Sequence, residues 1–84
     1  MARYFFDLRD GEYIPDTTGT ELASLAAARD EAAIRLGGLL RDDPAKFWSG
    51  DEWHIDVKNE WGLILFSICI VAQEAAVLRC QPKG

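Results

Sequence analysis

The sequence predicts a small α+β fold in the order β-β-α-β-β, with one amphipathic helix packed on a small antiparallel sheet. Two observations predict this class. Short segments in both halves of the chain alternate apolar and polar residues with the period of a half-buried strand. Between them, an Ala-rich stretch repeats its apolar residues with the period of a helix. The 84 residues, 49% of them hydrophobic, are expected to form one domain over residues 1–84.

The first two strands are predicted to form a hairpin. Residues 4–8 alternate in strand fashion, and the Asp-Gly pair at 10–11 is a common hairpin turn. Residues 12–14 can return as a short strand, and Pro15 ends that strand or confines it to a sheet edge, because proline donates no ladder hydrogen bond. Residues 16–22 are interpreted as the connection to the helix.

The helix is predicted from about Ser24 to Leu40. Ser24 can cap its N-terminus, and Thr20 is an alternative cap. At about 100° per residue, an apolar stripe runs along one side of this helix. The stripe contains Leu25, Ala28, Ala32, Leu36 and Leu39. The Asp43-Pro44 pair ends the helix, because a residue before proline avoids the helical conformation.

The second half of the chain begins with residues 42–52, which are interpreted as a polar loop interrupted by Phe47 and Trp48. Residues 53–58 then alternate as a half-buried strand, and Trp53 is expected in the core. A turn at residues 59–62 follows.

The longest apolar run extends from Leu63 to Ala72. Its residues 63–71 are apolar on both faces, which predicts a strand that is buried on both sides. A transmembrane helix needs roughly 20 apolar residues, so the run is too short to cross a membrane. The tail, residues 73–84, is expected to fray or to form a short helix.

Charge and cysteine content limit the partners and the location. The net charge of −5 repels phosphate backbones, so we expect no nucleic-acid partner. The chain opens with a strand-like segment and not with a basic segment followed by an apolar one, which argues against a signal peptide. The two cysteines have no Cys-x-x-Cys spacing and are interpreted as a small buried residue, Cys69, and an incidental thiol, Cys80. We therefore expect a cytoplasmic protein.

A set of residues between Arg3 and Phe66 carries a family resemblance. They are Arg3-Tyr4-Phe5-Phe6-Asp7, Asp10-Gly11, Asp16, Gly19-Thr20-Glu21-Leu22, Ala27-Ala28-Arg29-Asp30-Glu31-Ala32, Trp53, Val57, Glu60, Gly62 and Leu65. This pattern resembles a family of small proteins from rhizobia and related alphaproteobacteria that is known only as a domain of unknown function. The resemblance implies a short bacterial single-domain protein and brings no activity, ligand or catalytic residue. Trp61 departs from the pattern, in which a small or charged residue is usual.

A weaker resemblance exists to small antitoxin domains of the HicB type, which also place an acidic, Gly-containing connection before an Ala-rich helix on a small sheet. It implies a regulatory protein that binds a basic protein partner through its negative surface. The DNA-binding segment of those proteins has no counterpart in this sequence.

Catalytic chemistry of the usual acid–base kind would depend on His54, the only histidine, which is expected beside Asp56 on the polar face of a strand. A triad would also need Ser67 or Cys69 as nucleophile, and the apolar run around them predicts that both are buried. No catalytic residue is therefore assigned. A small enzyme with a site near His54 is kept as an alternative function.

The acids of the N-terminal hairpin are candidate ligands for a hard cation, which prefers several oxygen atoms. They are Asp7, Asp10, Glu12 and Asp16. Their spacing does not match a calcium loop, which places oxygen ligands at alternate positions and closes with a Glu. They are interpreted as turn acids, so the sequence predicts no metal and no cofactor.

Arg29 is the unusual residue of the helix, because it falls just inside the apolar stripe. A partly buried arginine needs an anionic or carbonyl partner. We predict an ion pair that joins the helix to the hairpin, with anion or ligand binding as the alternative role. The candidate partners are Asp7, Asp16 and Glu21.

The leading functional prediction is a non-enzymatic interaction module that forms a homodimer. One helix covers one face of the sheet, so the second face is expected to be bare and to need a second copy, through sheet faces or through a paired edge strand. Packing of the C-terminal tail across that face is the alternative. Loop and turn aromatics are also frequent at interfaces, so Phe47, Trp48 and Trp61 are expected to contact a partner or a ligand, with packing over the sheet edge as the alternative. The predicted interface residues are Phe5, Phe47, Trp48, Trp61, Ile64, Phe66, Ile68 and Ile70.

Overall fold

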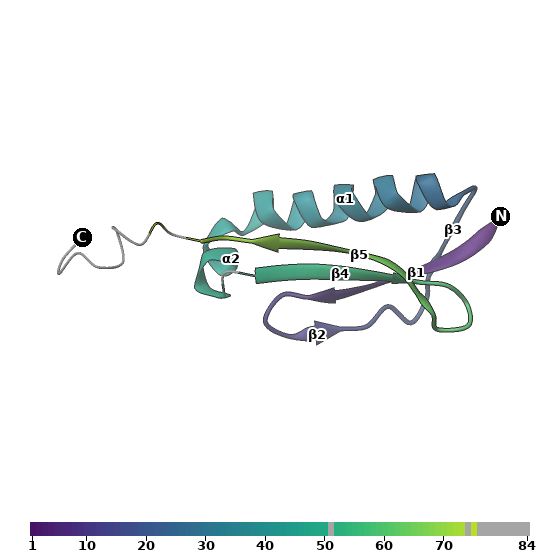
Figure 1. The fold of residues 1–84 in the computed structure, drawn as a ribbon, viewed down its shortest axis with the longest axis horizontal. Coiled ribbons are helices and arrows are strands. Elements are labelled where there is room, and N and C mark those ends of the chain that lie inside the picture. Colours follow the sequence, from purple (N-terminus) through teal and green to yellow (C-terminus); the bar gives the residue numbers. More distant parts are fainter. Residues whose placement is uncertain (51, 74, 76–84) are drawn as a thin grey trace.

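The structure is a computed structural model that describes residues 1–50, 52–73 and 75. Its elements follow in the order β1 (Ala2–Arg9), β2 (Tyr13–Ile14), β3 (Thr20–Leu22), α1 (Leu25–Asp42), α2 (Pro44–Gly50), β4 (Glu52–Lys58) and β5 (Ile64–Val71). The helix α1 runs along the sheet, and α2 lies near the start of β4 (Figure 1). The predicted α+β class is confirmed. The prediction for the tail lies almost entirely outside the described residues.

The sheet is antiparallel, in the order β2-β1-β4-β5, and β3 pairs with the beginning of β1. Residues 13–22 run back along β1, because Tyr13 is opposite Arg9 and Leu22 is opposite Ala2. The connection predicted for residues 16–22 therefore contains a third short strand. β4 pairs with β5 from Glu52 to Lys58, and among the described residues β5 forms one edge of the sheet.

The helix α1 begins where the sequence predicts. The side chain of Ser24 caps it by accepting a hydrogen bond from the N–H of Ala27 at 3.1 Å. Ala28, Ala32 and Leu36 are its buried residues, and the two alanines let the helix lie close to the sheet. Leu25 was predicted on the same stripe and is exposed instead.

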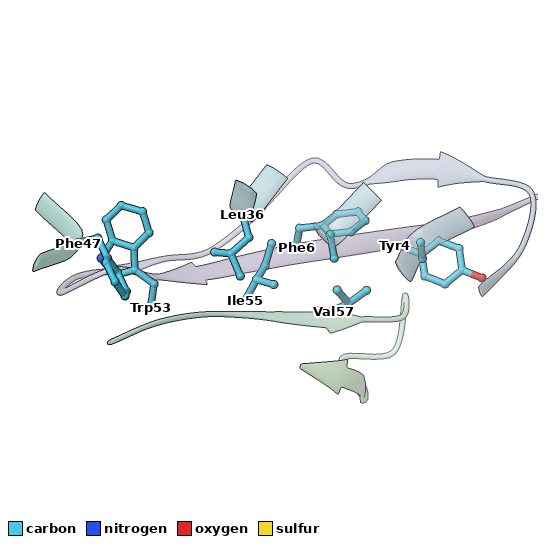
Figure 2. Packing of buried hydrophobic residues seen from close by; sticks show 9 residues of the cluster. Tyr4, Phe6, Leu36, Phe47, Trp53, Ile55 and Val57 are labelled. Atoms are coloured by element: carbon cyan, nitrogen blue, oxygen red, sulfur yellow. The ribbon is translucent and has the colours of Figure 1, made fainter. Parts of the chain in front are cut away.

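The core lies between α1 and the sheet (Figure 2). Tyr4 and Phe6 enter it from β1, and Trp53, Ile55 and Val57 enter it from β4. Trp53 is 1% exposed, which confirms its predicted place in the core.

Residues 44–50 form the helix α2, where the sequence had predicted a loop. Pro44 suits the first helical position, and the Asp43 carboxylate accepts the N–H of Lys46 at 3.2 Å. Phe47 is buried and meets the Trp53 ring edge-on, with the ring centroids 5.4 Å apart. Its assignment to an interface was therefore wrong, because this turn of helix directs it into the core. The adjacent Trp48 is exposed.

The faces of β5 are the reverse of the prediction. Directly opposed residues of neighbouring strands share a face, and the register pairs core residues of β4 with Ile70, Ile68 and Phe66. These three residues therefore lie on the helix face, half-buried against the core. Their assignment to the bare face was wrong, because a strand that is apolar on both faces gives no signal of which face turns inward. Ile64 lies beside the register shift at Val57/Lys58 and is exposed.

The other row of β5 consists of Leu65, Ser67, Cys69 and Val71, and all four are exposed. The predicted burial of Ser67 and Cys69, and of β5 on both sides, was wrong. In the part of the chain that the structure describes, no strand lies along the outer side of β5, and α1 covers one face of the sheet only. Within the described residues, neither helix has the length and hydropathy needed to cross a membrane.

Candidate functional site

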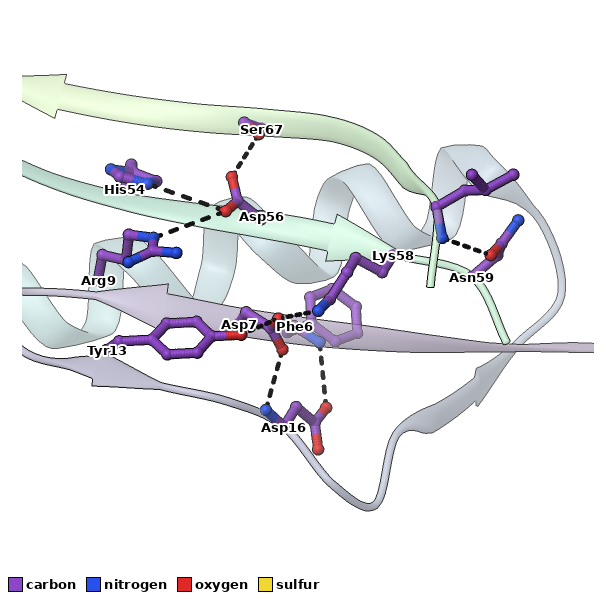
Figure 3. A network of polar contacts seen from close by, with 11 residues as sticks. Phe6, Asp7, Arg9, Tyr13, Asp16, His54, Asp56, Lys58, Asn59 and Ser67 are labelled. Atoms are coloured by element: carbon purple, nitrogen blue, oxygen red, sulfur yellow. Dashed lines mark hydrogen bonds and ion pairs between the residues drawn. The ribbon is translucent and has the colours of Figure 1, made fainter. Parts of the chain in front are cut away.

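The face of the sheet opposite α1, which we call the open face, carries a network of charged residues (Figure 3). Because successive strand residues alternate between faces, the residues of β1 and β4 that flank the core residues point to this side. They include Phe5, Asp7, Arg9, Glu52, His54, Asp56 and Lys58. Phe5 lies there as predicted. The face as a whole is not bare apolar surface.

Asp7 is the centre of the network and is 2% exposed. Its carboxylate accepts hydrogen bonds from the hydroxyl of Tyr13 at 2.9 Å and the N–H of Asp16 at 3.0 Å, and it pairs with the Lys58 ammonium at 2.5 Å. Burial by itself raises the pKa of this carboxyl, but these donors together hold the pKa below its usual value. Asp7 in turn raises the pKa of Lys58 through the bond between them.

Asp16 fills the gap between β2 and β3. Its carboxylate accepts the N–H of Phe6 at 3.1 Å, and Phe6 lies in the part of β1 that pairs with neither β2 nor β3. The same carboxylate accepts the N–H groups of Thr18 and Gly19 at 3.0 Å each. Burial raises the pKa of Asp16, and the three N–H donors and the nearby Arg35 charge more than offset it, so the pKa is lowered. The two carboxylates of Asp7 and Asp16 thus hold the hairpin together.

The predicted ion pair of Arg29 is not present among the described residues. Arg29 is exposed, whereas Arg35 lies half-buried with its guanidinium 4.2 Å from the centre of the Phe6 ring and donates to Thr20 Oγ1 at 3.0 Å. At about 100° per residue the two arginines lie on opposite borders of the buried stripe. Arg35 is on the border that faces the hairpin. The prediction that Arg29 joins the helix to the hairpin was therefore wrong, and Arg35 makes that contact.

The three carboxylates proposed as partners of Arg29 are bound elsewhere. Glu21 pairs with Arg3 at 3.0 Å, at the junction of β1 and β3. Asp7 and Asp16 serve the hairpin, as described above. Arg35 itself pairs with Glu31, one turn earlier in α1, at 2.8 Å.

Asp56 is the centre of a second group on the open face. It accepts a hydrogen bond from Ser67 Oγ at 2.5 Å, and its Oδ2 lies 3.9 Å from Nε2 of His54 and 4.0 Å from Nε of Arg9. A nucleophile and its base need a direct hydrogen bond. Ser67 donates to Asp56 and not to His54, so the described residues form no Ser-His arrangement.

Glu52, His54 and Cys69 also meet on the open face. One ligand atom from each lies within 4.8 Å of the other two. His54 and Cys69 are directly opposed in the register of β4 and β5, and Glu52 is two residues before His54 on the same side of β4. The sequence does not predict this group, because only the strand register brings Cys69 beside His54.

Two cavities lie away from His54. One of about 270 Å³ lies on the helix side, where Ile14 and Pro15 of the hairpin face Leu39 of α1, and Asp16 and Arg35 also line it. The other, of about 200 Å³, lies between Phe5 and residues 58–62. The polar side chains of the first cavity already have the partners given above, so its remaining surface is largely apolar.

Residues 3–71 match the family described as Domain of unknown function (DUF6894). The chain belongs to this family. No curated protein and no solved structure matches the chain.

Several residues that carry the family resemblance have structural roles in this member of the family. Asp7 and Asp16 bind backbone N–H groups, and Gly19 adopts φ +78° beside Asp16. A Cβ at Gly19 would lie 2.8 Å from Cγ of Arg3 and from Cε2 of Phe5. These contacts give Asp7, Asp16 and Gly19 roles in folding.

Proposed function

We propose that the chain is a non-enzymatic interaction module that forms a homodimer by pairing the β5 strands of two copies. The observation that carries this proposal is the outer side of Ile64–Val71, which we call the β5 edge. Among the described residues, β5 has β4 on one side and no strand on the other. Its eight residues, ILFSICIV, contain no charge and no proline. Protein edges normally use charged residues, proline or shortness to prevent pairing.

Exposed apolar side chains surround the β5 edge. Leu65 is 41% exposed and Val71 is 64% exposed, and Trp61 and Leu63 of the preceding turn are exposed as well. Each large apolar side chain left in water forgoes roughly 1.5–3 kcal/mol of burial free energy. The opposite edge of the sheet is formed by the two-residue strand β2 and by β3, which are too short to offer a comparable surface.

The partner that fits the β5 edge best is a second copy of the chain. An antiparallel β5–β5 pair around a two-fold axis would place the uncharged strand against itself, so no like charges would oppose each other. Both copies of α1 would then lie on the same face of one continuous sheet. Stacking of open faces is less favourable, because it would bury Arg9, Asp56 and Lys58.

The proposed setting is the cytoplasm of a bacterium, and Cys69 supports it, because an exposed free thiol persists in a reducing compartment. A different protein that adds a strand to β5 is the competing occupant. The net charge of −5 disfavours nucleic acid as a partner.

The test is the mass of the protein in solution, measured by light scattering after size-exclusion chromatography at micromolar concentration. The wild type should be a dimer, and Leu65→Lys combined with Val71→Lys should be a monomer, since four lysines would meet along the paired strands. Ile34→Lys is the matched control, because Ile34 is 68% exposed and lies on the side of α1 opposite its buried residues. A monomeric wild type, or a dimer that survives both β5 substitutions, would overturn the proposal.

A further inference from the structure

We propose that Glu52, His54 and Cys69 bind a zinc ion on the open face and thereby join β4 to the edge strand β5. Their ligand atoms already lie within 4.8 Å of one another. The ligands of a tetrahedral zinc ion lie about 3.5 Å apart, given zinc–ligand bonds of about 2.0–2.3 Å. Side-chain rotation closes the difference, because Glu52 and Cys69 are exposed and free to turn.

The backbone fixes the geometry of the three ligands. His54 and Cys69 occupy directly opposed positions, so their side chains leave the sheet on the same side. Glu52 shares that side, because residues two apart on a strand point the same way. All three ligands thus come from two adjacent strands and from none of the loops, so the pairing of the strands sets their backbone positions.

The chemistry of the donors selects zinc. A thiolate, an imidazole and a carboxylate are the three side-chain types that zinc takes in proteins. Calcium and magnesium prefer oxygen ligands only and make little use of sulfur or nitrogen. Three protein ligands leave a fourth position for water. The charge also balances, because the ion neutralises one carboxylate and one thiolate on the surface of an acidic protein.

Asp56 supplies the support that a zinc-bound histidine needs. A ligating histidine donates its other ring N–H to a carboxylate or carbonyl, which orients the ring. Oδ2 of Asp56 lies 3.9 Å from Nε2 of His54, and the Ser67 hydroxyl holds Asp56 in place. If zinc binds Nδ1 of His54, then Nε2–H can donate to Asp56. Asp56 is therefore a positioning residue for this site.

Cobalt is the probe for the site, because a cysteine thiolate bound to Co²⁺ gives an intense charge-transfer band in the near ultraviolet. The Cys80→Ser variant is used as the background, which leaves Cys69 as the only thiol. Titration with Co²⁺ should produce this band at one ion per chain, and Zn²⁺ should remove it. Magnesium in excess should have no effect.

Single substitutions distinguish the proposed zinc ligands from Asp56, which only orients His54. Cys69→Ser should abolish the band, and His54→Gln should weaken Zn²⁺ binding at least about tenfold, since each removes one of three ligands. Asp56→Asn should keep the band and weaken binding about 10–100-fold. Glu60→Gln, an exposed carboxylate outside the site, is the matched control and should change nothing.

The absence of the cobalt band in the folded Cys80→Ser protein would overturn the site, and so would unchanged zinc affinity in Cys69→Ser. One ion per two chains would overturn it as well, because the proposed ligands belong to one copy. Circular dichroism of each variant checks folding. The outcome is distinguishable from that of the β5 pairing, because the mass in solution is measured on metal-free protein.

Discussion

Asp7 and Asp16 show how single residues hold this fold together. A hairpin with only a two-residue return strand forms few ladder hydrogen bonds, and these two carboxylates accept backbone N–H groups in their place. Each carboxylate must be ionised to accept all of its donors. The stability of the hairpin is therefore linked to pH.

The first prediction concerns acid. Folding lowers the pKa values of Asp7 and Asp16 below the unfolded value of about 3.9. A lowered folded pKa contributes stability that is complete above the unfolded pKa and is lost as the pH falls through the folded pKa. The free energy of unfolding, measured with urea, should therefore fall as the pH is lowered below about 4–5.

Asp7→Asn tests the origin of this acid dependence. It should lower the free energy of unfolding at pH 7 by roughly 1.5–3 kcal/mol, because a neutral amide replaces the charged acceptor of the Tyr13 hydroxyl and of the Asp16 N–H, and it should flatten the dependence below pH 4. Asp30→Asn, on the exposed side of α1, is the control and should leave both unchanged. An equally steep acid dependence in Asp7→Asn would contradict the assignment.

Gly19 gives a second prediction at the residue scale. Gly19→Ala should destabilise the protein by about 2–4 kcal/mol, because the residue has φ +78° and the added Cβ would lie 2.8 Å from the side chains of Arg3 and Phe5. Gly62→Ala separates the two causes. Gly62 has φ +82° with open space around it, so its substitution should cost only about 1 kcal/mol. Thermal unfolding measures both, and equal losses would show that the close contact is relieved elsewhere.

At the scale of elements, α1 is held by burial of one stripe and by its cap, and two glycines weaken its last turns. Gly37 lies on the exposed side, and an added Cβ would meet no atom within 4 Å. It has no conformational role that requires glycine, since it is not among the glycines with positive φ.

Gly37→Ala should therefore raise the free energy of unfolding by about 0.5–1 kcal/mol, because alanine loses less backbone entropy in a helix. Ala33→Gly, also exposed on α1, is the reverse control and should lower it by a similar amount. Chemical denaturation measures both variants. A destabilised Gly37→Ala would show that this surface of α1 is covered in solution.

At the scale of the whole molecule, the uneven covering of the sheet decides how the protein meets others. One face is covered by α1, the open face is charged, and the β5 edge is uncharged and exposed. Hydrogen exchange tests the proposed pairing directly. Amides of β5 that point away from β4 should exchange more slowly as the protein concentration rises through the dimer dissociation constant.

Amides inside α1 are the internal control for that measurement, because their hydrogen bonds lie within the helix and should not respond to concentration. If the protein dimerises while β5 exchange stays constant, the interface lies elsewhere on the molecule. Trp61 and Trp48, both exposed, would then be the next residues to test.

The sequence by itself determined the fold class, the course of α1 and the core position of Trp53. These features follow from local periodicity and from caps, which act between residues close in the chain. The sequence did not predict β3 or α2, because a three-residue strand and a two-turn helix carry too little periodicity. It placed Phe47 at an interface for the same reason.

Only the tertiary structure decided which face of β5 turns inward, which arginine of α1 meets the hairpin, and which residues Cys69 lies beside. A strand that is apolar on both faces fits either register equally well, so the pairing with β4 selects one. Arg29 and Arg35 border the same stripe, and the position of the hairpin distinguishes them. Cross-strand neighbours such as His54 and Cys69 are set by pairing between segments far apart in the chain, which no local pattern encodes.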